Sequence, residues 1–245
     1  MKILAIADTE ERCLWECFRK ERFEGVNLIL SAGDLDPDYL EFLVTVINKP
    51  LIYVRGNHDD RYARHAPGGC ICVEDTVYVY RGIRIAGLGG SMRYRDGANM
   101  YTEREMAKRV RKLSRKVRMV GGCDILLTHA PAAGAGDLDD LPHRGFECFN
   151  TALESWNPDY MVHGMCTNAM VATFNANVST HAGQRSSTPV AIRSLSWTKR
   201  ATPSVAGRQP GSIRKPCAAS SSATRQSSPL PPEHPGNCQQ PPRRG

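Results

Sequence analysis

Short apolar segments that end in polar or glycine residues alternate with amphipathic segments along the chain as far as Gly164. The apolar segments have the length and composition of β-strands, and the amphipathic segments have helical spacing. Strands are predicted at 2–7, 27–31, 50–55, 124–128 and 159–163, and helices at 11–22, 38–48, 103–118 and 146–156. Two further β-rich runs, 76–80 and 83–87, flank Arg81-Gly82, which is typical of a hairpin turn. This alternation predicts an α/β domain with a mixed sheet or two packed sheets.

The composition changes abruptly after Gly164. The last 81 residues hold ten of the sixteen prolines, and they carry ten Lys or Arg against one acidic residue. No hydrophobic periodicity in this stretch is long enough to form an element, so too little apolar area can be buried to offset the conformational entropy. We therefore expect one domain over 1–164, followed by a basic, Ser/Pro-rich and disordered tail over 165–245.

The net charge of +7 and the isoelectric point near 9.0 come from this tail. Residues 1–164 carry 22 basic and 24 acidic side chains, so the domain itself does not indicate a nucleic-acid partner. The tail leaves one alternative open, a basic arm that binds RNA or DNA with strong salt dependence. The basic run from Lys108 to Arg118 fits a solvated helix face better, because Val110, Leu113 and Val117 are spaced to face inward.

Membrane insertion and export are not expected from the sequence. No apolar run approaches the roughly 18 residues that a membrane span requires, and the N-terminus lacks a signal-peptide pattern. The nine cysteines are scattered, and Cys70-x-Cys72 has neither zinc-ribbon nor redox spacing. The sequence therefore predicts a cytoplasmic protein with reduced thiols and no membrane partner.

Candidate metal ligands directly follow four of the predicted strands. They occur in Asp8-Thr9-Glu10, Gly33-Asp34, Gly56-Asn57-His58-Asp59 and Thr128-His129. Because the carboxyl ends of parallel strands in an α/β sheet gather at one edge, these side chains are expected to converge. Carboxylate, amide and imidazole groups together are the ligands of a two-metal hydrolytic site.

Each of these runs also has an ordinary structural interpretation. Asp8 precedes a predicted helix and fits an N-cap, and Glu10 would be favoured in the first turn of that helix. Gly33-Asp34 is common turn chemistry, and a lone His129 could equally be a core or cap residue. Asn57-His58 is the strongest signal, since it places an amide ligand beside an imidazole that can face the substrate and donate a proton.

The combination of motifs over residues 1–164 resembles the calcineurin-like metallophosphoesterase family. The usual series of that family is Asp-x-His, Gly-Asp, Gly-Asn-His-Asp/Glu, a lone His and Gly-His-x-His. The resemblance implies an α/β/β/α sandwich of two sheets that hydrolyses phosphate mono- or diesters. It also implies two divalent metal ions, Mn²⁺ or Fe²⁺/Fe³⁺, with Zn²⁺ as a further candidate.

By the same resemblance, Asp8 binds the first metal, Asp34 bridges, and Asn57 and His129 bind the second metal. Glu10 stands at the family's first histidine position, where a carboxylate oxygen could substitute for the imidazole.

The remaining expected roles concern the phosphate-ester substrate. By the resemblance, His58 acts as the general acid and is held by Asp59. The basic residues Arg55, Arg61 and Arg93 lie near strand ends and are expected to clamp phosphate oxygens.

The last motif of the series is missing, because Gly164-Met165-Cys166-Thr167 stands where Gly-His-x-His is due. Codons for Gly-Met-Cys-Thr, read one base out of register, permit His-Val-His. We therefore hypothesise a one-base deletion beside codon 164, with out-of-frame translation after it. Resequencing the coding DNA across codons 160–170 tests this, and absence of the intact motif from every frame would end the hypothesis.

Three functions from different classes follow from these observations. The first is a metal-dependent phosphoesterase whose activity is impaired by the missing imidazole ligands. The second is a non-catalytic binding scaffold of the same fold, and the third is a nucleic-acid binder acting through its basic tail. Metal content, hydrolysis of a generic aryl phosphodiester and salt-sensitive retention on RNA or DNA distinguish the three.

Overall fold

The computed structural model describes residues 1–165, 171–175 and 191–194. Within these ranges, the first sheet has the strand order β11-β1-β2-β3-β4. Its strands are β1 (Lys2–Ile6), β2 (Val26–Ser31), β3 (Leu51–Tyr53), β4 (Ile71–Cys72) and β11 (Val171–Asn175). The first four run parallel, and β11 pairs antiparallel with β1. The parallel strands therefore end along one edge of this sheet.

The second sheet has the order β12-β10-β9-β6-β5. Its strands are β5 (Val77–Tyr80), β6 (Ile83–Leu88), β9 (Ile125–Thr128), β10 (Tyr160–His163) and β12 (Ala191–Ser194). Strands β5 and β6 form the predicted hairpin, and both turn residues, Arg81 and Gly82, have positive φ as a type I′ turn requires. A short parallel pair, β7 (Ser91–Met92) and β8 (Met100–Tyr101), stands apart from both sheets.

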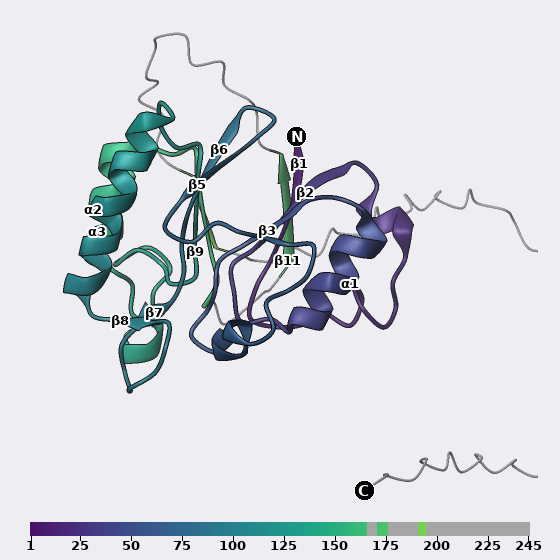
Figure 1. Cartoon of the computed structure of the whole chain (residues 1–245), viewed down its shortest axis with the longest axis horizontal. Helices are drawn as coiled ribbons and strands as arrows, with labels where there is room; N and C mark the ends of the chain where they lie inside the picture. Colours follow the sequence, from purple (N-terminus) through teal and green to yellow (C-terminus); the bar gives the residue numbers. More distant parts are fainter. Residues whose placement is uncertain (166–170, 176–190, 195–245) are drawn as a thin grey trace, which may run out of the picture. The chain divides into compact units, whose positions relative to one another are not determined.

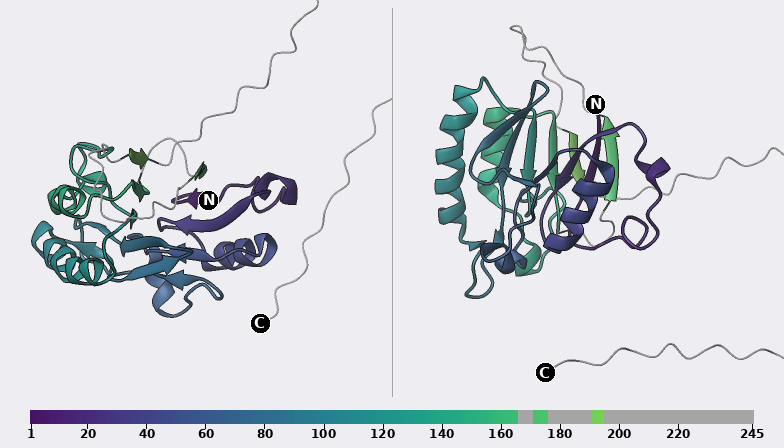
Figure 2. Two further views of the ribbon diagram at one scale, coloured as in Figure 1. Left: turned by 90° about the horizontal axis from the view of Figure 1, so that it is seen from above. Right: turned by 45° about the vertical axis from the view of Figure 1, so that its right-hand side comes forward.

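Three buried layers of apolar side chains hold the domain together. A core built from strands of both sheets contains Ile3, Leu28, Ile52, Ile85 and Leu127. On the far side of the first sheet lies α1 (Pro37–Ile47), and on the far side of the second lie α2 (Glu103–Met119) and α3 (Glu147–Trp156). Figures 1 and 2 show the helices on opposite sides of the strands. The predicted α/β/β/α sandwich is confirmed.

Local sequence signals explain where the helices begin. The Asp36 carboxylate accepts a hydrogen bond from the Asp38 amide (2.9 Å), and Pro37 occupies the first turn of α1. Thr102 and Glu105 form a capping box at the start of α2. Helix α2 buries Met106, Val110, Leu113 and Val117, as an ordinary amphipathic helix with a basic outer face would. No described helix has both the length and the apolar character needed to cross a bilayer.

The helix predicted at 11–22 is wrong. This segment forms turns, followed by a 3₁₀ helix, η1 (Lys20–Phe23). Its aromatic side chains pack on α1, where Trp15 lies 4.9 Å from Phe42 between ring centroids, and Phe18 stacks on Phe23. Packing against a distant helix therefore overrides the helical spacing of this segment.

The structure also differs from expectation after Gly164, where no element was predicted. Strand β11 extends the first sheet along β1, with Ile6 opposite Val171, and β12 extends the second sheet along β10. Both strands add hydrogen-bonded neighbours to what would otherwise be sheet edges. The rest of the predicted tail, 166–170, 176–190 and 195–245, lies outside the described residues.

Candidate metal centre

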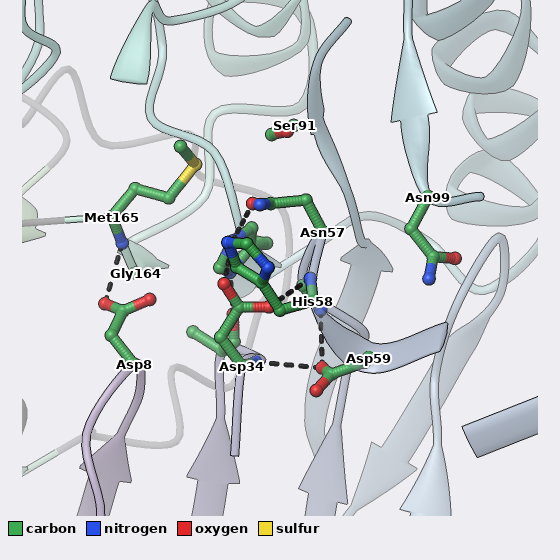
Figure 3. Close-up of polar contacts among 12 residues, drawn as sticks. Asp8, Asp34, Asn57, His58, Asp59, Ser91, Asn99, Gly164 and Met165 are labelled. Carbon is green, nitrogen blue, oxygen red and sulfur yellow. Dashed lines mark hydrogen bonds and ion pairs between the residues drawn. The ribbon is translucent and has the colours of Figure 1, made fainter. Parts of the chain in front are cut away.

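Loops at the carboxyl ends of strands from both sheets bring the predicted ligands together. Asp8 follows β1, Asp34 follows β2, Asn57 follows β3 and His129 follows β9. One donor atom each from Asp8, Asp34 and His129 lies within 4.8 Å of the others, a spacing that could hold a metal ion. Figure 3 shows Asp8, Asp34 and Asn57 turned toward one central space. The convergence follows from the parallel strand order.

Left-handed backbone conformations and a close contact between two loops produce this arrangement. Asp8 and Asp34 both have left-handed φ, 60° and 58°, a conformation that Asp tolerates better than most residues. Gly33 and Gly56 lie in contact, since a Cβ on Gly33 would be 2.3 Å from the Gly56 nitrogen. A Cβ on Gly56 would be 2.0 Å from Asp34 Oδ1. Glycine is therefore required at both positions for the β2 and β3 loops to meet.

His129 is fully buried, and acceptors face both of its ring nitrogens. Nδ1 lies 2.7 Å from the Ala32 carbonyl oxygen, and Nε2 lies 3.0 Å from Asn57 Oδ1 and 3.4 Å from Asp34 Oδ2. The ring must therefore carry two protons or direct the Nε2 lone pair at a cation. A carbonyl partner on Nδ1 is the usual support of a metal-binding histidine.

The charges of this group depend on one another. Burial lowers the pKa of His129, but the Asp34 carboxylate, together with Asp8 and the Ala32 carbonyl oxygen, outweighs burial and raises that pKa to about 9. Burial likewise raises the pKa of Asp34, and the charge and hydrogen bond of His129 bring it below its ordinary value. In the absence of a cation, the second proton on His129 balances the carboxylates. The donor set of carboxylates, amide and imidazole therefore fits a divalent cation in place of that proton.

Asp59 was predicted to hold His58, which stays a prediction, and the structure shows its carboxylate bound to backbone amides of two loops. Its buried carboxylate accepts hydrogen bonds from the backbone amides of Gly56 (2.7 Å) and Asp34 (2.8 Å), so it joins the β2 and β3 loops. Burial, together with the nearby Asp34 charge, raises the pKa of Asp59 to about 6. The His58 ring is exposed, and its backbone amide donates to Asp34 Oδ1 at 2.8 Å. Asp59 therefore positions the loop that carries His58.

A cavity of about 230 Å³ opens over the ligand group. It is lined by Asp8, Asp34, Asn57, His58, Tyr94, Pro142, His143 and Met165. Sequence reasoning did not identify Tyr94, Pro142 or His143, which lie at least seven residues beyond the ends of the predicted strands 83–87 and 124–128. The Tyr94 hydroxyl accepts a hydrogen bond from Asn57 Nδ2 at 3.3 Å, which fixes the amide and leaves Oδ1 toward His129.

Glu10 does not join the ligand group of the described residues. Its carboxylate accepts a hydrogen bond from the Asp36 amide at 3.2 Å. Glu10 therefore ties the loop after β1 to the start of α1, and its role as a ligand stays a prediction.

The three predicted phosphate clamps are paired with carboxylates and do not line the cavity. Arg55 binds Glu74, with Nε at 3.1 Å, and Arg61 pairs with Asp36. Arg93 lies 3.0 Å from Glu105. Their expected contact with substrate remains a prediction that this arrangement does not favour.

At the end of β10, where the family motif would place histidines, this chain contributes backbone groups to the site. The Met165 amide donates to Asp8 Oδ2 at 2.8 Å, as Figure 3 shows. A Cβ on Gly164 would come within 3.1 Å of both Asp8 carboxylate oxygens. Residues 166–170, which include the rest of the missing motif, are outside the described part of the chain.

A family model for calcineurin-like phosphoesterases matches residues 1–164. Among solved structures, one crystal structure is 15% identical with a TM-score of 0.51, and the alignment covers 69% of this chain and 85% of that one. A crystal structure of TT1561 of Thermus thermophilus is 18% identical with a TM-score of 0.47, covering 66% and 80%. No curated protein sequence matches significantly. The first likeness supports the fold described above.

Proposed function

The chain belongs to the calcineurin-like phosphoesterase family, a family of metal-dependent phosphoester hydrolases, and from that premise we propose that it hydrolyses phosphate mono- or diesters at the Asp8, Asp34, Asn57 and His129 group. The observation that carries the proposal is the convergence of three donor side chains within 4.8 Å beneath a cavity lined by His58.

Two cation positions are proposed at this group. Asp34, Asn57 and His129 would hold one cation, and Asp8 with Asp34 would hold the other. What the cations supply when bound is Lewis acidity toward the phosphoryl oxygens and the attacking water. Support comes from the His129 ring, whose Nε2 faces Asn57 and Asp34 while Nδ1 is occupied by a carbonyl oxygen.

His58 is the proposed proton donor to the leaving oxygen. Its ring lies at the cavity, and its backbone amide is fixed to Asp34 Oδ1 (2.8 Å), so the residue keeps its place beside the proposed bridging carboxylate. Asp59 is a positioning residue, because its carboxylate holds the amides of Gly56 and Asp34. A general acid of this kind contributes about 10²–10⁴-fold to a rate.

The two positions are unequal, so we propose that this chain binds its second cation weakly and has reduced activity. The position of Asp8 has only two side-chain donors in the described ligand group, since Glu10 bonds the Asp36 amide. Mn²⁺ or Fe²⁺/Fe³⁺, with Zn²⁺ as a further candidate, are the proposed ions, because a mixed carboxylate and imidazole site suits them.

A cytoplasmic location is proposed on the cysteines, since the six in the described part of the chain are free thiols. The substrate is a phosphate ester, and any nucleic-acid contact is assigned to the basic stretch after Gly164.

The test is metal content and hydrolysis measured on the same sample of full-length chain. After loading with Mn²⁺, the protein is assayed with bis(p-nitrophenyl) phosphate and p-nitrophenyl phosphate. We expect His58→Ala to lower turnover by about 10²-fold or more with metal content unchanged. His65→Ala, a matched change at a surface histidine that does not line the cavity, should leave turnover at the wild-type value. His65 lies beside Asp38 and Glu41, a second group of possible metal donors, so this variant is the control for turnover alone.

A second function, the non-catalytic scaffold, is favoured by one observation. All three predicted phosphate-binding arginines are paired with carboxylates. A folded chain that binds no Mn²⁺ and hydrolyses neither ester would support the scaffold and contradict the enzyme.

A further inference from the structure

His143 brings a second imidazole to the cavity, from a segment that contains no predicted ligand. It ends the 3₁₀ helix η3 (Leu141–His143) and lines the same cavity as His58 and Asp34. Its Nδ1 lies 2.5 Å from Asp140 Oδ2, so one edge of the ring is fixed by a carboxylate. The other edge, which carries Nε2, is then the one available to a ligand.

The segment that carries His143 is held in place by its own hydrogen bonds. The Asp137 carboxylate accepts from the amides of Gly134 (2.8 Å) and Gly145 (3.3 Å), at the two ends of the loop. Across the loop, the Leu138 amide donates to the His143 carbonyl at 3.2 Å. The loop is therefore closed on itself, and His143 has a defined position at the cavity wall.

A phosphate ester in this cavity needs hydrogen-bond donors. Two of the lining residues, Asp8 and Asp34, are carboxylates that the ester would meet only through cations. The Asn57 amide group already donates to Tyr94. His58 is assigned to the leaving oxygen, and Arg55, Arg61 and Arg93 do not line the cavity. Of the lining side chains, Tyr94, whose hydroxyl accepts from Asn57 and keeps its own hydrogen, and His143 remain to bind the anionic oxygens of the phosphoryl group. His143 is the one whose ring is held by a carboxylate, that of Asp140.

We propose that His143, oriented by Asp140, donates its Nε2–H to a non-bridging oxygen of the phosphoryl group bound in the cavity. The proposal rests on the function proposed above and adds a residue that contacts the substrate. A role as a metal ligand is a different role, because His143 is not in the group of donors that lie within 4.8 Å. Asp140 is a positioning residue in this scheme, since it acts through the His143 ring.

The experiment measures the affinity of the Mn²⁺-loaded full-length chain for inorganic phosphate by isothermal titration calorimetry. His143→Gln should weaken phosphate binding by about 10- to 100-fold, which corresponds to the loss of one hydrogen bond to a charged group. Asp140→Asn should weaken it less. The controls are His65→Gln, and Asp139→Asn at the exposed neighbour of Asp140, and both should leave the affinity unchanged.

Mn²⁺ affinity, measured by electron paramagnetic resonance, and the thermal unfolding midpoint are recorded for each variant. Unchanged Mn²⁺ affinity and an unchanged midpoint, with weaker phosphate binding, support the proposal. Phosphate affinity equal to wild type in His143→Gln would overturn it, and so would a parallel loss of Mn²⁺, which would make the ring a metal ligand. If the glutamine variant unfolds, His143→Ala and Asp140→Asn decide the question.

Phosphate affinity is read without turnover, so the two proposals fail separately. A wild-type chain that binds phosphate through His143 but hydrolyses neither ester would contradict the proposed function alone. A wild-type chain that hydrolyses both esters, with a glutamine variant that binds phosphate equally well, would contradict the role of His143 alone. A wild-type chain that binds no phosphate would overturn the His143 proposal.

Discussion

At the carboxyl ends of β1, β2 and β3, each connecting loop brings a ligand side chain to the cavity, and the loops are joined to one another. Asp59 holds two backbone amides from these loops, and Gly33 and Gly56 let the chains touch. At the carboxyl end of β10, the described chain contributes a backbone amide, from Met165 to Asp8. The first region supplies candidate side-chain ligands for a cation. The second supplies an amide hydrogen bond that orients one of those ligands, Asp8.

This difference indicates that the two proposed cation positions have unequal sets of ligands. Of the two proposed cation positions, the one at Asp34, Asn57 and His129 has more candidate side-chain ligands, and the one at Asp8 and Asp34 has fewer. A defect confined to β10 is therefore expected to weaken one cation and leave the other.

The largest expected effect comes from Asp34→Asn, which removes the carboxylate that both proposed cation positions share. Mn²⁺ affinity should fall by more than about 100-fold, because even the loss of an outer partner of a ligand costs 10–100-fold. Titration calorimetry with Mn²⁺ measures the change. Asp60→Asn, at an exposed carboxylate two residues after His58, should bind as wild type. Equal affinity in the two variants would mean that the cation does not lie at Asp34.

A somewhat smaller effect is expected from Gly56→Ala, which tests the contact between the loops. The added methyl group would overlap Asp34 Oδ1 and approach His129 Cε1 (2.7 Å), so both ligands must move. We expect unfolding to become easier by about 1–3 kcal/mol and Mn²⁺ affinity to fall by about 10-fold or more. Chemical denaturation and calorimetry provide the two readings. In Gly97→Ala the methyl group meets only the flexible end of Met100 at 3.3 Å, so little change is expected.

Adding imidazoles after β10 should strengthen binding at the second proposed cation position. Met165→His combined with Thr167→His gives the sequence Gly-His-Cys-His after β10. Met165 already lines the cavity, and its left-handed φ (56°) is one that histidine tolerates. We expect about a tenfold gain in affinity for the second Mn²⁺, a change of about 1.4 kcal/mol, together with faster ester hydrolysis. Met165→Leu is the control without a donor. A double variant with one bound Mn²⁺ and unchanged turnover would show that the deficit lies elsewhere.

The smallest effect is expected from Thr173→Pro in β11, opposite Leu4 of β1. Proline lacks the amide hydrogen and cannot donate to the ladder, so the free energy of unfolding should fall by about 1 kcal/mol. Ser220→Pro, in the Ser-rich run of the last 81 residues, is the control. Denaturant titration measures the free energy of unfolding of the two variants and of the wild type. Equal unfolding midpoints would contradict a contribution of β11 to the stability of the first sheet.

Much of this architecture could be predicted from the sequence, because strands that are buried on both faces read as continuous apolar runs. Lys2–Ile6 and Ile125–Thr128 begin and end within one residue of their predicted bounds. The ligand runs were recognisable because they directly follow such strands, and parallel order brings strand ends together. The sequence alone therefore predicts that Asp34 and His129 converge.

What could not be predicted depends on contacts between distant segments. Residues 11–22 have helical spacing, but their conformation is set by aromatic contacts with α1, which local spacing does not encode. The contact between Asp59 and the Asp34 amide could not be predicted for a similar reason, since that amide comes from another loop. Arg55 was expected to contact phosphate, and its pairing with Glu74, 19 residues away in the sequence, could not be predicted from local pattern. His143 carries no sequence signal beyond an acidic residue three positions earlier.

The hydrogen bond from the Met165 amide to Asp8 spans 157 residues, and β11 pairs with the strand at the N-terminus. Contacts of such long range form slowly, because the intervening chain must close before they stabilise anything. During synthesis from the N-terminus, Asp8, Asp34 and Asn57 leave the ribosome well before β10 and β11 exist. A nascent chain that ends before Met165 lacks the amide that orients Asp8. Ribosome-stalled chains of increasing length should therefore acquire full cation affinity only after this residue has emerged.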